Sequence, residues 1–356
     1  MTTSSQRILV YGATGYTGQL IVEEATRRGF EITLGGRDAA KLEALAGPLG
    51  LESRAVALDD AAGLRTALGD VAAVLHIAGP FSATAEPMLE ACLATRTHYL
   101  DVTGEIDVFE AIARRHDEAR AAGIVFLPGV GFDVVPTDCL ALHTAARVES
   151  PQRLRLVLAG MGGGLSRGTA KTAVESAGEG LRIRRDGVLV RLPSGSLERH
   201  FDFGAGPANA VAMPLGDVAT AFYSTGIPDI EVYLVASGRM PAQLRASHWL
   251  APLLRRRFVQ DWLKRRIDAL PEGPTEAERA ETRSVLFAEV EGEGGECARS
   301  ILETPSGYAL TPLAALEAAR RTVAGEVEPG FHTPATAFGA DFVLSLEGCT
   351  RRDLAD

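Results

Sequence analysis

The fold is decided by the stretch Arg7-Ile8-Leu9-Val10-Tyr11-Gly12-Ala13-Thr14-Gly15-Tyr16-Thr17-Gly18. Its apolar start ends in three glycines, and residues 19–25 continue with helical character. Strand, glycine turn and helix in this order are typical of the opening of a dinucleotide-binding βαβ unit. In such a unit Gly12 forms the tight turn, Gly15 lets the backbone approach a pyrophosphate at the helix N-terminus, and Gly18 lets the helix pack on the sheet.

The end of the second predicted strand indicates which dinucleotide binds. Residues 30–35 form this strand, and Arg37 and Asp38 follow it. An NAD site usually places a carboxylate here on the ribose 2′-hydroxyl, whereas a guanidinium pairs with the 2′-phosphate of NADP. The alternatives are a solvated Arg37 before a helix capped by Asp38, and an Asp38 that reaches the ribose of NAD. We predict NADP (NADPH) as the cofactor, with NAD less favoured.

The composition is that of an ordinary globular protein with room for two domains. The chain has 356 residues, 46% of them hydrophobic and 23% charged, and a formal net charge of −10. This negative charge argues against a nucleic-acid partner and leaves a small-molecule substrate as the expected one.

Signals for secretion, membrane insertion or metal binding are not found in the sequence. Residues 1–6 are short and polar, and no run of 18 apolar residues follows, so we expect a cytoplasmic protein. Cys92, Cys139, Cys297 and Cys349 are scattered without CxxC spacing, which indicates a reducing compartment and no structural zinc. No metal site is expected.

Alternating strands and helices predict an α/β Rossmann domain over residues 1–148. Parallel strands with helices between them form a doubly wound sheet, which binds ligands at the carboxyl ends of its strands. The six predicted strands cover residues 8–11, 30–35, 53–58, 71–78, 98–102 and 124–127, and a single helix is expected over 108–122.

The pattern changes after residue 148 and predicts an α+β domain over residues 149–340, with a mostly antiparallel sheet and a role in substrate binding or oligomerisation. Residues 341–356 are a C-terminal segment that could return to the first domain. The predicted strands cover residues 154–159, 188–192, 230–236, 284–291 and 298–304, the helices cover 168–177, 214–221 and 313–324, and 269–280 is an exposed loop.

Three loops at carboxyl ends of the predicted strands carry the candidate chemistry. Asp101 and Glu105 follow one strand, and Asp133 lies in a loop rich in glycine and proline after the next. We predict these carboxylates as the catalytic residues, for proton transfer or substrate anchoring, although Asp101 and Asp133 could instead cap helices. The predicted cofactor-binding residues are Gly12, Thr14, Gly15, Tyr16, Thr17, Gly18, Arg37, Ala78, Gly79, Pro80 and Phe81.

Several segments together resemble the saccharopine dehydrogenase-like family of NADP-binding oxidoreductases, in particular its trans-acting enoyl reductase branch. They are Tyr11-Gly12-Ala13-Thr14-Gly15-Tyr16-Thr17-Gly18, Gly36-Arg37, Ala78-Gly79-Pro80-Phe81, residues 98–105, residues 129–136, Ser224-Thr225-Gly226-Ile227-Pro228, Glu231-Val232-Tyr233 and Thr333-Pro334-Ala335-Thr336-Ala337-Phe338-Gly339.

The resemblance implies a Rossmann domain followed by an α+β domain, and hydride transfer to a C=C, C=N or C=O bond of a small organic substrate. It does not imply saccharopine as the substrate, because nothing marks Arg167, Lys171 and Arg182 as a carboxylate clamp. A short-chain dehydrogenase mechanism is disfavoured, because no tyrosine is followed by a lysine four residues later. The alternative function is a non-catalytic NADP-binding regulatory or redox-sensing protein.

Residues 249–266 form a basic, amphipathic segment that contains both tryptophans, Trp249 and Trp262. One interpretation is peripheral contact with a membrane surface. The favoured one is packing against its own domain or against a second subunit of a homodimer, because Pro252 interrupts the helix early.

Overall fold

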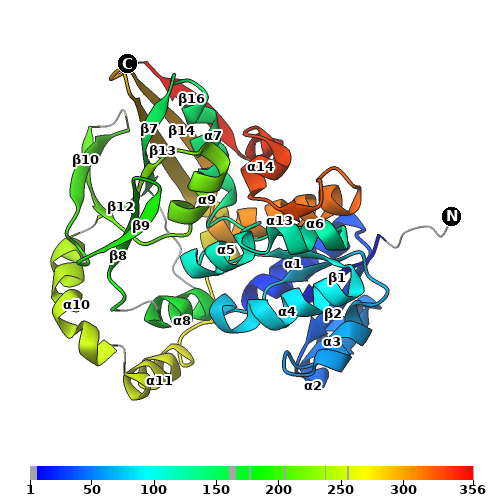
Figure 1. Ribbon diagram of the computed structural model, residues 1–356. Coiled ribbons are helices and arrows are strands. Elements are labelled where there is room, and N and C mark those ends of the chain that lie inside the picture. Colours follow the sequence, from blue (N-terminus) through cyan, green and yellow to red (C-terminus); the bar gives the residue numbers. More distant parts are fainter. Residues whose placement is uncertain are drawn as a thin grey trace. The chain divides into compact units, whose positions relative to one another are not determined.

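The computed structural model describes residues 6–159, 166–175, 178–203, 206–236, 238–254 and 256–355. The chain divides into two compact units (Figure 1). The first unit comprises Met1–Val135 and Tyr308–Phe338, and the second comprises Pro136–Gly307 and Gly339–Asp356.

The first unit is built on a parallel sheet of seven strands, which confirms the predicted Rossmann sheet. Its order is β15-β6-β5-β4-β1-β2-β3, so the winding direction reverses between β1 and β4. Ligands of such sheets bind at this point, outside the carboxyl ends of the strands. The strands are β1 (Ile8–Tyr11), β2 (Ile32–Gly36), β3 (Glu52–Ala55), β4 (Ala73–His76), β5 (His98–Asp101), β6 (Val125–Leu127) and β15 (Gly330–Phe331).

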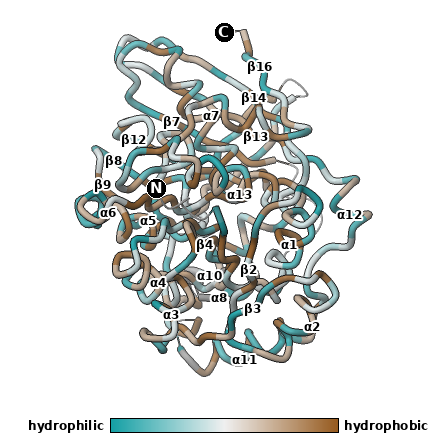
Figure 2. The backbone as a smooth tube through the Cα atoms, turned by 90° about the vertical axis from the view of Figure 1, so that its right-hand side faces the viewer, coloured by the Kyte–Doolittle hydropathy of each residue, from teal (hydrophilic) through white to brown (hydrophobic). Residues whose placement is uncertain are grey.

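The central strands form the core because every residue of β1, β2 and β4 is buried, and Figure 2 shows the hydropathy along β2 and β4. Strands covered by helices on both faces need such continuous apolar runs. The helices of this unit are α1 (Tyr16–Arg28), α2 (Ala39–Leu49), α3 (Ala61–Leu68), α4 (Phe81–Thr95), α5 (Ile106–Ala113), α6 (His116–Ala122), α13 (Gly307–Val323) and α14 (Pro334–Phe338).

The single helix predicted over 108–122 is wrong, since α5 and α6 are separate helices. Arg115, between them, has non-helical dihedral angles (φ −96°, ψ 15°). Its guanidinium pairs with Glu86 and Glu90 of α4 and with Glu118 of α6. The turn therefore ties both helices to α4.

The division of the chain differs from the predicted boundaries at 148 and 340. Residues 308–338 belong to the first unit, where β15 pairs with β6 and the buried side of α13 adds to the core. A strand of two residues has no periodicity that a sequence pattern could reveal. The C-terminal segment does not return to the first unit, because β16 (Thr350–Leu354) pairs antiparallel with β14 of the second.

The second unit contains a mixed sheet of nine strands, mostly antiparallel as predicted. Its path is β10-β11-β12-β7-β13-β14-β16, and the β8–β9 hairpin joins it at β12. Only β12 and β7 pair in parallel along this path among the described residues. The strands are β7 (Pro151–Ala159), β8 (Leu181–Arg185), β9 (Val188–Leu192), β10 (Glu198–Asp202), β11 (Pro207–Ala212), β12 (Asp229–Val235), β13 (Arg283–Gly292), β14 (Cys297–Pro305) and β16.

The helices of the second unit depart from the prediction at several ends. They are α7 (Val135–Ala145), α8 (Arg167–Glu175), α9 (Asp217–Thr225), α10 (Met240–Leu254), α11 (Arg257–Ile267), α12 (Glu276–Glu281) and the short 3₁₀ helix Phe342–Ser345. The helix predicted over 214–221 starts and ends later, and residues 176–177 of the helix predicted over 168–177 lie outside the described residues. The loop predicted over 269–280 contains the start of α12, which Thr275 and Glu278 close with a capping box.

Two aromatic side chains of the segment 249–266 are exposed. Phe258 and Trp262 of α11 are 68% and 53% exposed, whereas Leu263 is half-buried and Ile267 buried. Since α11 contacts α8, the segment packs against its own domain, as the favoured interpretation expects, but on one side only. The side chains of Trp249 and Arg257, and all of Arg255, lie outside the described residues. Among the described residues, no helix has the length and apolar character needed to cross a bilayer.

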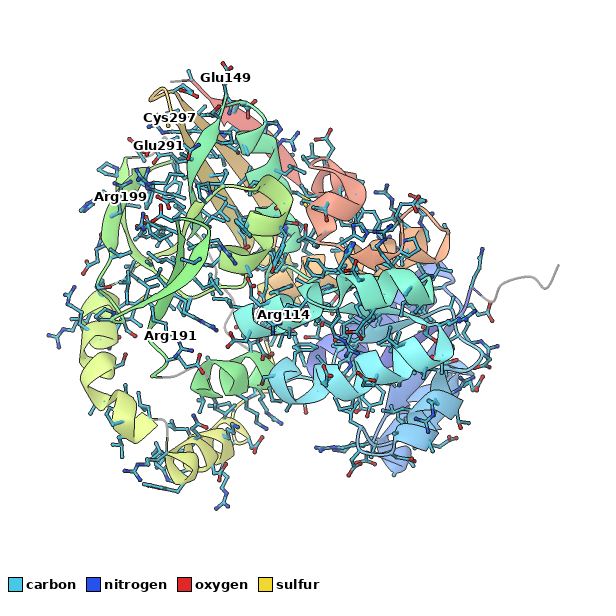
Figure 3. The ribbon with its side chains drawn as sticks, viewed as in Figure 1. Arg114, Glu149, Arg191, Arg199, Glu291 and Cys297 are labelled. Atoms are coloured by element: carbon cyan, nitrogen blue, oxygen red, sulfur yellow. The ribbon has the colours of Figure 1, made fainter. Side chains whose placement is uncertain are left out.

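A charged network covers part of the sheet in the second unit. Arg155 of β7 has a side chain only 4% exposed, and it pairs with Glu289 (2.7 Å) and Glu291 (2.5 Å) of β13 and with Glu231 (3.7 Å) of β12. Figure 3 labels Glu291, which lies opposite Cys297 in the sheet. Arg155 therefore neutralises carboxylates that the sheet holds out of water.

We expect Arg155→Ala to lower the free energy of unfolding by about 1.5–3 kcal/mol, the scale of hydrogen bonds to charged groups, because it removes the buried cation that three glutamates share. Each glutamate keeps one other arginine partner, which is Arg185, Arg299 or Arg153. The matched control is Arg153→Ala, which removes a side chain 39% exposed from the same strand face. Its cost should stay below about 1 kcal/mol. Urea unfolding of both variants measures this, and equal losses would contradict the role of Arg155.

Candidate cofactor and active site

The loop between β1 and α1 can be built only with glycine at two positions. Gly12 has φ +96°, and a Cβ there would lie 2.8 Å from the backbone nitrogen of Ala78. A Cβ on Gly18 would collide with the carbonyl oxygen of Gly12. These two glycines let strand, loop and helix approach each other closely.

Gly15 differs from them, because its surroundings are open. It is exposed, and the nearest atom to a Cβ there, apart from its chain neighbours, would be the Gly12 carbonyl oxygen at 3.4 Å. As the N-cap of α1 it offers no side-chain acceptor, and the first turn holds no acidic residue. A helix N-terminus without a side-chain cap or an acidic residue favours an anion, and a dinucleotide pyrophosphate fits this loop.

The end of β2 presents one cation and one carboxylate with different tasks. Arg37 is exposed, and no ion pair joins it to another described residue. The Asp38 side chain accepts a hydrogen bond from the Lys41 backbone N–H (3.1 Å) and caps α2. Because Asp38 has this task, Arg37 is the group that fits an anionic 2′-phosphate here.

Tyr11 at the end of β1 belongs to the same edge. Its hydroxyl donates to the Val56 carbonyl oxygen (2.9 Å). Burial raises the pKa of Tyr11, with Arg37 lowering it and Asp59 raising it. Asp59 follows β3 and was not singled out in the sequence, because a lone carboxylate in a loop carries no motif.

The loop after β4 is fixed by a neutral histidine. His76 is fully buried, and burial lowers its pKa to about 4. Its Nε2 lies 3.1 Å from the Ala78 carbonyl oxygen, so the neutral ring donates to it. Gly79 and Pro80, which follow, are joined by a cis peptide bond, and Gly79 is exposed while Phe81 is buried.

Asp101, at the end of β5, is buried, and both of its carboxylate oxygens accept hydrogen bonds. It accepts hydrogen bonds from the Tyr99 hydroxyl (2.7 Å) and from the backbone N–H groups of Thr103 (2.9 Å) and Gly129 (2.9 Å). Burial raises its pKa to about 6, although these hydrogen bonds oppose the shift. We reassign Asp101 from catalysis to positioning, because proton transfer to a ligand would require it to release these groups.

Glu105 caps a helix that is remote from it in sequence. Its carboxylate accepts from the backbone N–H groups of Phe81 (2.7 Å) and Ser82 (2.9 Å), at the start of α4. Its own N–H donates to the Thr103 hydroxyl (3.1 Å). Since Pro80 at the N-cap provides no side-chain acceptor, Glu105 supplies the cap for α4.

Asp133 is the predicted catalytic carboxylate that solvent reaches. It is exposed, and its Oδ2 would lie 3.3 Å from a Cβ on Gly104. Protein atoms still crowd the carboxyl group, and this partial desolvation raises its pKa. The absence of a side chain on Gly104 gives Asp133 room at this edge.

Two residues at this edge escaped the sequence prediction because α13 lies far along the chain. The Thr311 hydroxyl accepts from the Phe132 N–H (3.1 Å), next to Asp133. Tyr308 packs edge-on against Tyr16 of the glycine loop, with 5.2 Å between the ring centroids. No local motif announces such contacts, which only the return of residues 308–338 creates.

The basic residues considered for a carboxylate clamp are engaged within the second unit. Lys171 pairs with Asp268 (2.5 Å), and the Arg167 side chain donates to the Leu270 carbonyl oxygen (2.6 Å). Arg182 lies 3.8 Å from Glu179. These contacts do not bring Arg167, Lys171 and Arg182 to a common acceptor, so they do not support a carboxylate clamp.

The pKa of Asp101 leads to a pH-dependent stability. Because the folded pKa of about 6 lies above the ordinary value of 3.8, the folded protein binds this proton more tightly than the unfolded chain. The contribution of Asp101 to the free energy of unfolding is therefore largest below about pH 4 and falls by about 3 kcal/mol as the pH rises to about 6.

Asp101→Asn removes this titration and keeps an acceptor oxygen for the two backbone N–H groups. Urea unfolding of both proteins from pH 4 to 7 gives the difference between their stabilities. We expect the unsubstituted protein to lose stability relative to Asp101→Asn as the pH rises to about 6. Above about pH 6 the difference between the two free energies of unfolding should stay constant. A difference that does not change with pH would contradict the assigned environment.

Comparisons with known proteins also indicate an NADP-binding domain. Residues 8–127 match the saccharopine dehydrogenase NADP binding domain. A trans-acting enoyl reductase of Mycobacterium leprae is 34% identical over 152 residues, which are 40% of this chain and 36% of that protein. A saccharopine dehydrogenase-like oxidoreductase of Mus musculus is 29% identical over 157 residues, or 38% of this chain and 37% of that protein. The matches thus span less than half the length of these relatives.

A solved structure shows the same fold over nearly the whole chain. It is the saccharopine dehydrogenase (L-Glu forming) of Saccharomyces cerevisiae, with a TM-score of 0.67, 11% identity, and coverage of 98% of this chain and 100% of that one. The domain match over residues 8–127 bears out the resemblance to the saccharopine dehydrogenase family there and NADP as the cofactor, and the solved structure bears out the fold. Residues 8–127 of this chain are an NADP-binding domain of the saccharopine dehydrogenase family.

Proposed function

We propose that this protein is an NADP-dependent oxidoreductase that transfers a hydride to a C=C, C=N or C=O bond of a small organic substrate. The observation that carries the proposal is one sheet edge with an uncapped helix N-terminus, an exposed arginine and an exposed carboxylate of raised pKa. NADPH, when bound, supplies the hydride from its nicotinamide. Among the three bonds we favour C=C, because relatives of the chain are named enoyl reductases.

The cofactor is held, in this proposal, by the loops at the carboxyl ends of β1, β2 and β4. Arg37 pairs with the 2′-phosphate, and the open space at Gly15 takes the pyrophosphate. The pyrophosphate region is formed by Gly12, Thr14, Gly15, Tyr16, Thr17 and Gly18, and the path toward the nicotinamide by Ala78, Gly79, Pro80 and Phe81.

Asp133 is the group that we assign to the substrate. Its exposure lets a ligand reach it, and desolvation raises its pKa, which is the direction that a carboxyl group acting as a proton donor needs. Asp101 and Glu105 act through the loops that they hold, so they are positioning residues. An oxidoreductase needs such fixed loops, because small displacements of the reacting groups lower the rate steeply.

The cofactor assignment is tested by Arg37→Ala, which should weaken NADPH binding by roughly 1.5–3 kcal/mol, the scale of a charge-assisted hydrogen bond. NADH has no 2′-phosphate, so its binding should not change. Lys41→Ala, which removes an exposed cation from the next helix, is the matched control and should leave both affinities unchanged. Calorimetric titration with both cofactors measures this, and equal losses for NADPH and NADH would refute the assignment.

Turnover tests the enzyme assignment. With NADPH and a panel of enoyl, imine and carbonyl compounds, we expect Asp133→Asn to lower turnover by roughly 10²–10⁴-fold without changing NADPH affinity. Asp107→Asn, at another exposed carboxylate of the same unit, is the control and should keep full activity.

Gly15→Val should abolish NADPH binding without unfolding the protein, because its side chain points into open space rather than into the fold. Gly12→Val is unsuitable, since φ +96° would strain it whether or not a cofactor binds. NADPH binding without turnover of any compound in the panel would overturn the enzyme proposal in favour of a regulatory or redox-sensing protein.

A further inference from the structure

Exposed apolar side chains are concentrated in one short part of the second unit. Among the described residues, eight large hydrophobic side chains are exposed, and five of them lie between positions 250 and 270. These five are Leu250 (52%), Leu253 (51%), Phe258 (68%), Trp262 (53%) and Leu270 (53%). Isolated exposed apolar residues are ordinary, but such a cluster marks an interaction surface.

The helix α11 has apolar residues on two sides. Val259, Leu263 and Ile267 are half-buried or buried, on the side where α11 packs beside α8 (Figure 1). Phe258 and Trp262, one helical turn apart, share the opposite, exposed side. Packing within the unit therefore accounts for only one apolar side of α11.

Basic residues border the exposed side. Arg265 and Arg266 are exposed, and the Arg266 guanidinium lies 4.7 Å from the centre of the Trp262 ring. Residues 256–266 contain five basic residues and a single acidic one, Asp261, in a chain whose net charge is −10. We call Phe258, Trp262, Arg265 and Arg266 the aromatic-basic face.

Nearby carboxylates do not neutralise this face. Asp268 pairs with Lys171 of α8, and Glu272 lies 3.5 Å from Arg167, the first residue of α8. Both carboxylates therefore pair with cations outside the aromatic-basic face. Among the described residues, no ion pair joins Arg265 or Arg266 to a carboxylate. The positive charge of the face is therefore available to a partner.

We propose that the aromatic-basic face binds the surface of an anionic phospholipid bilayer. Aromatic rings partition into the headgroup region, and arginines beside them pair with lipid phosphates, as in interfacial amphipathic helices. A two-fold contact with a second copy would bring two such positive clusters together, which the charge disfavours. One short helix provides weak, reversible binding.

The test uses the full chain with vesicles of phosphatidylglycerol and phosphatidylcholine, and with vesicles of phosphatidylcholine alone. We expect cosedimentation with the anionic vesicles only, weakened by added salt. In a Trp249→Phe background Trp262 is the only tryptophan, so its emission should shift to shorter wavelength on binding.

Variants separate the contribution of the aromatic rings to vesicle binding from that of the arginines. Phe258→Ser/Trp262→Ser should abolish binding, whereas Val188→Ser, at an apolar residue 60% exposed elsewhere in the unit, should not change it. Arg265→Gln/Arg266→Gln should weaken binding about 30-fold, given the usual contribution of a basic residue near an anionic surface. The control of equal charge change is Arg191→Gln/Arg199→Gln, at two exposed arginines labelled in Figure 3.

Three results would overturn the proposal. They are no association with anionic vesicles, association that the face variants leave unchanged, and a dimer in solution that Phe258→Ser/Trp262→Ser converts to a monomer while no vesicle binding occurs. The last result would identify the face as a contact between copies of the chain.

Discussion

The buried carboxylate of Asp101 is the interaction on which the proposed cofactor edge depends. It receives three hydrogen bonds, one from a tyrosine of its own strand and two from the backbone of loops that follow β5 and β6. A carboxylate without contact to water needs such partners, because an unsatisfied buried charge costs several kcal/mol. The same hydrogen bonds fix the backbone of both loops, so the sheet edge is rigid where its strands end.

A second layer of contacts extends from this point. The Thr103 hydroxyl holds the N–H of Glu105, and the Glu105 carboxylate caps α4 next to the loop after β4. From the other side, the Thr311 hydroxyl of α13 fixes Phe132 beside Asp133. Three loops and a helix from the far end of the chain are thereby connected through side chains that a ligand need not touch. This arrangement leaves Asp133 and Arg37 as exposed charged groups at the edge.

The second unit uses charge in a different way. Its sheet buries Arg155 among glutamates from two neighbouring strands, so opposite charges replace apolar packing on that part of the sheet. The aromatic-basic face of α11 shows the opposite arrangement, with apolar rings in solvent and arginines that no described carboxylate neutralises. The first pattern is satisfied within the sheet, and the second is the surface for which we propose an anionic bilayer as the partner.

The sequence by itself determined the Rossmann sheet and the glycine loop, because strand periodicity and turn chemistry are local properties. It also predicted Arg37 as the group for the 2′-phosphate, and its motifs together carried the resemblance to the family. It also placed Asp101, Glu105 and Asp133 at one sheet edge, since parallel strands end together. Their surroundings were decided by tertiary structure alone: Asp101 is buried with three hydrogen bonds, Glu105 is half-buried and caps α4, and Asp133 is exposed. The return of residues 308–338 and the exposure of Phe258 and Trp262 were likewise beyond the sequence, because pairing between remote segments and the choice of buried helix side depend on packing partners.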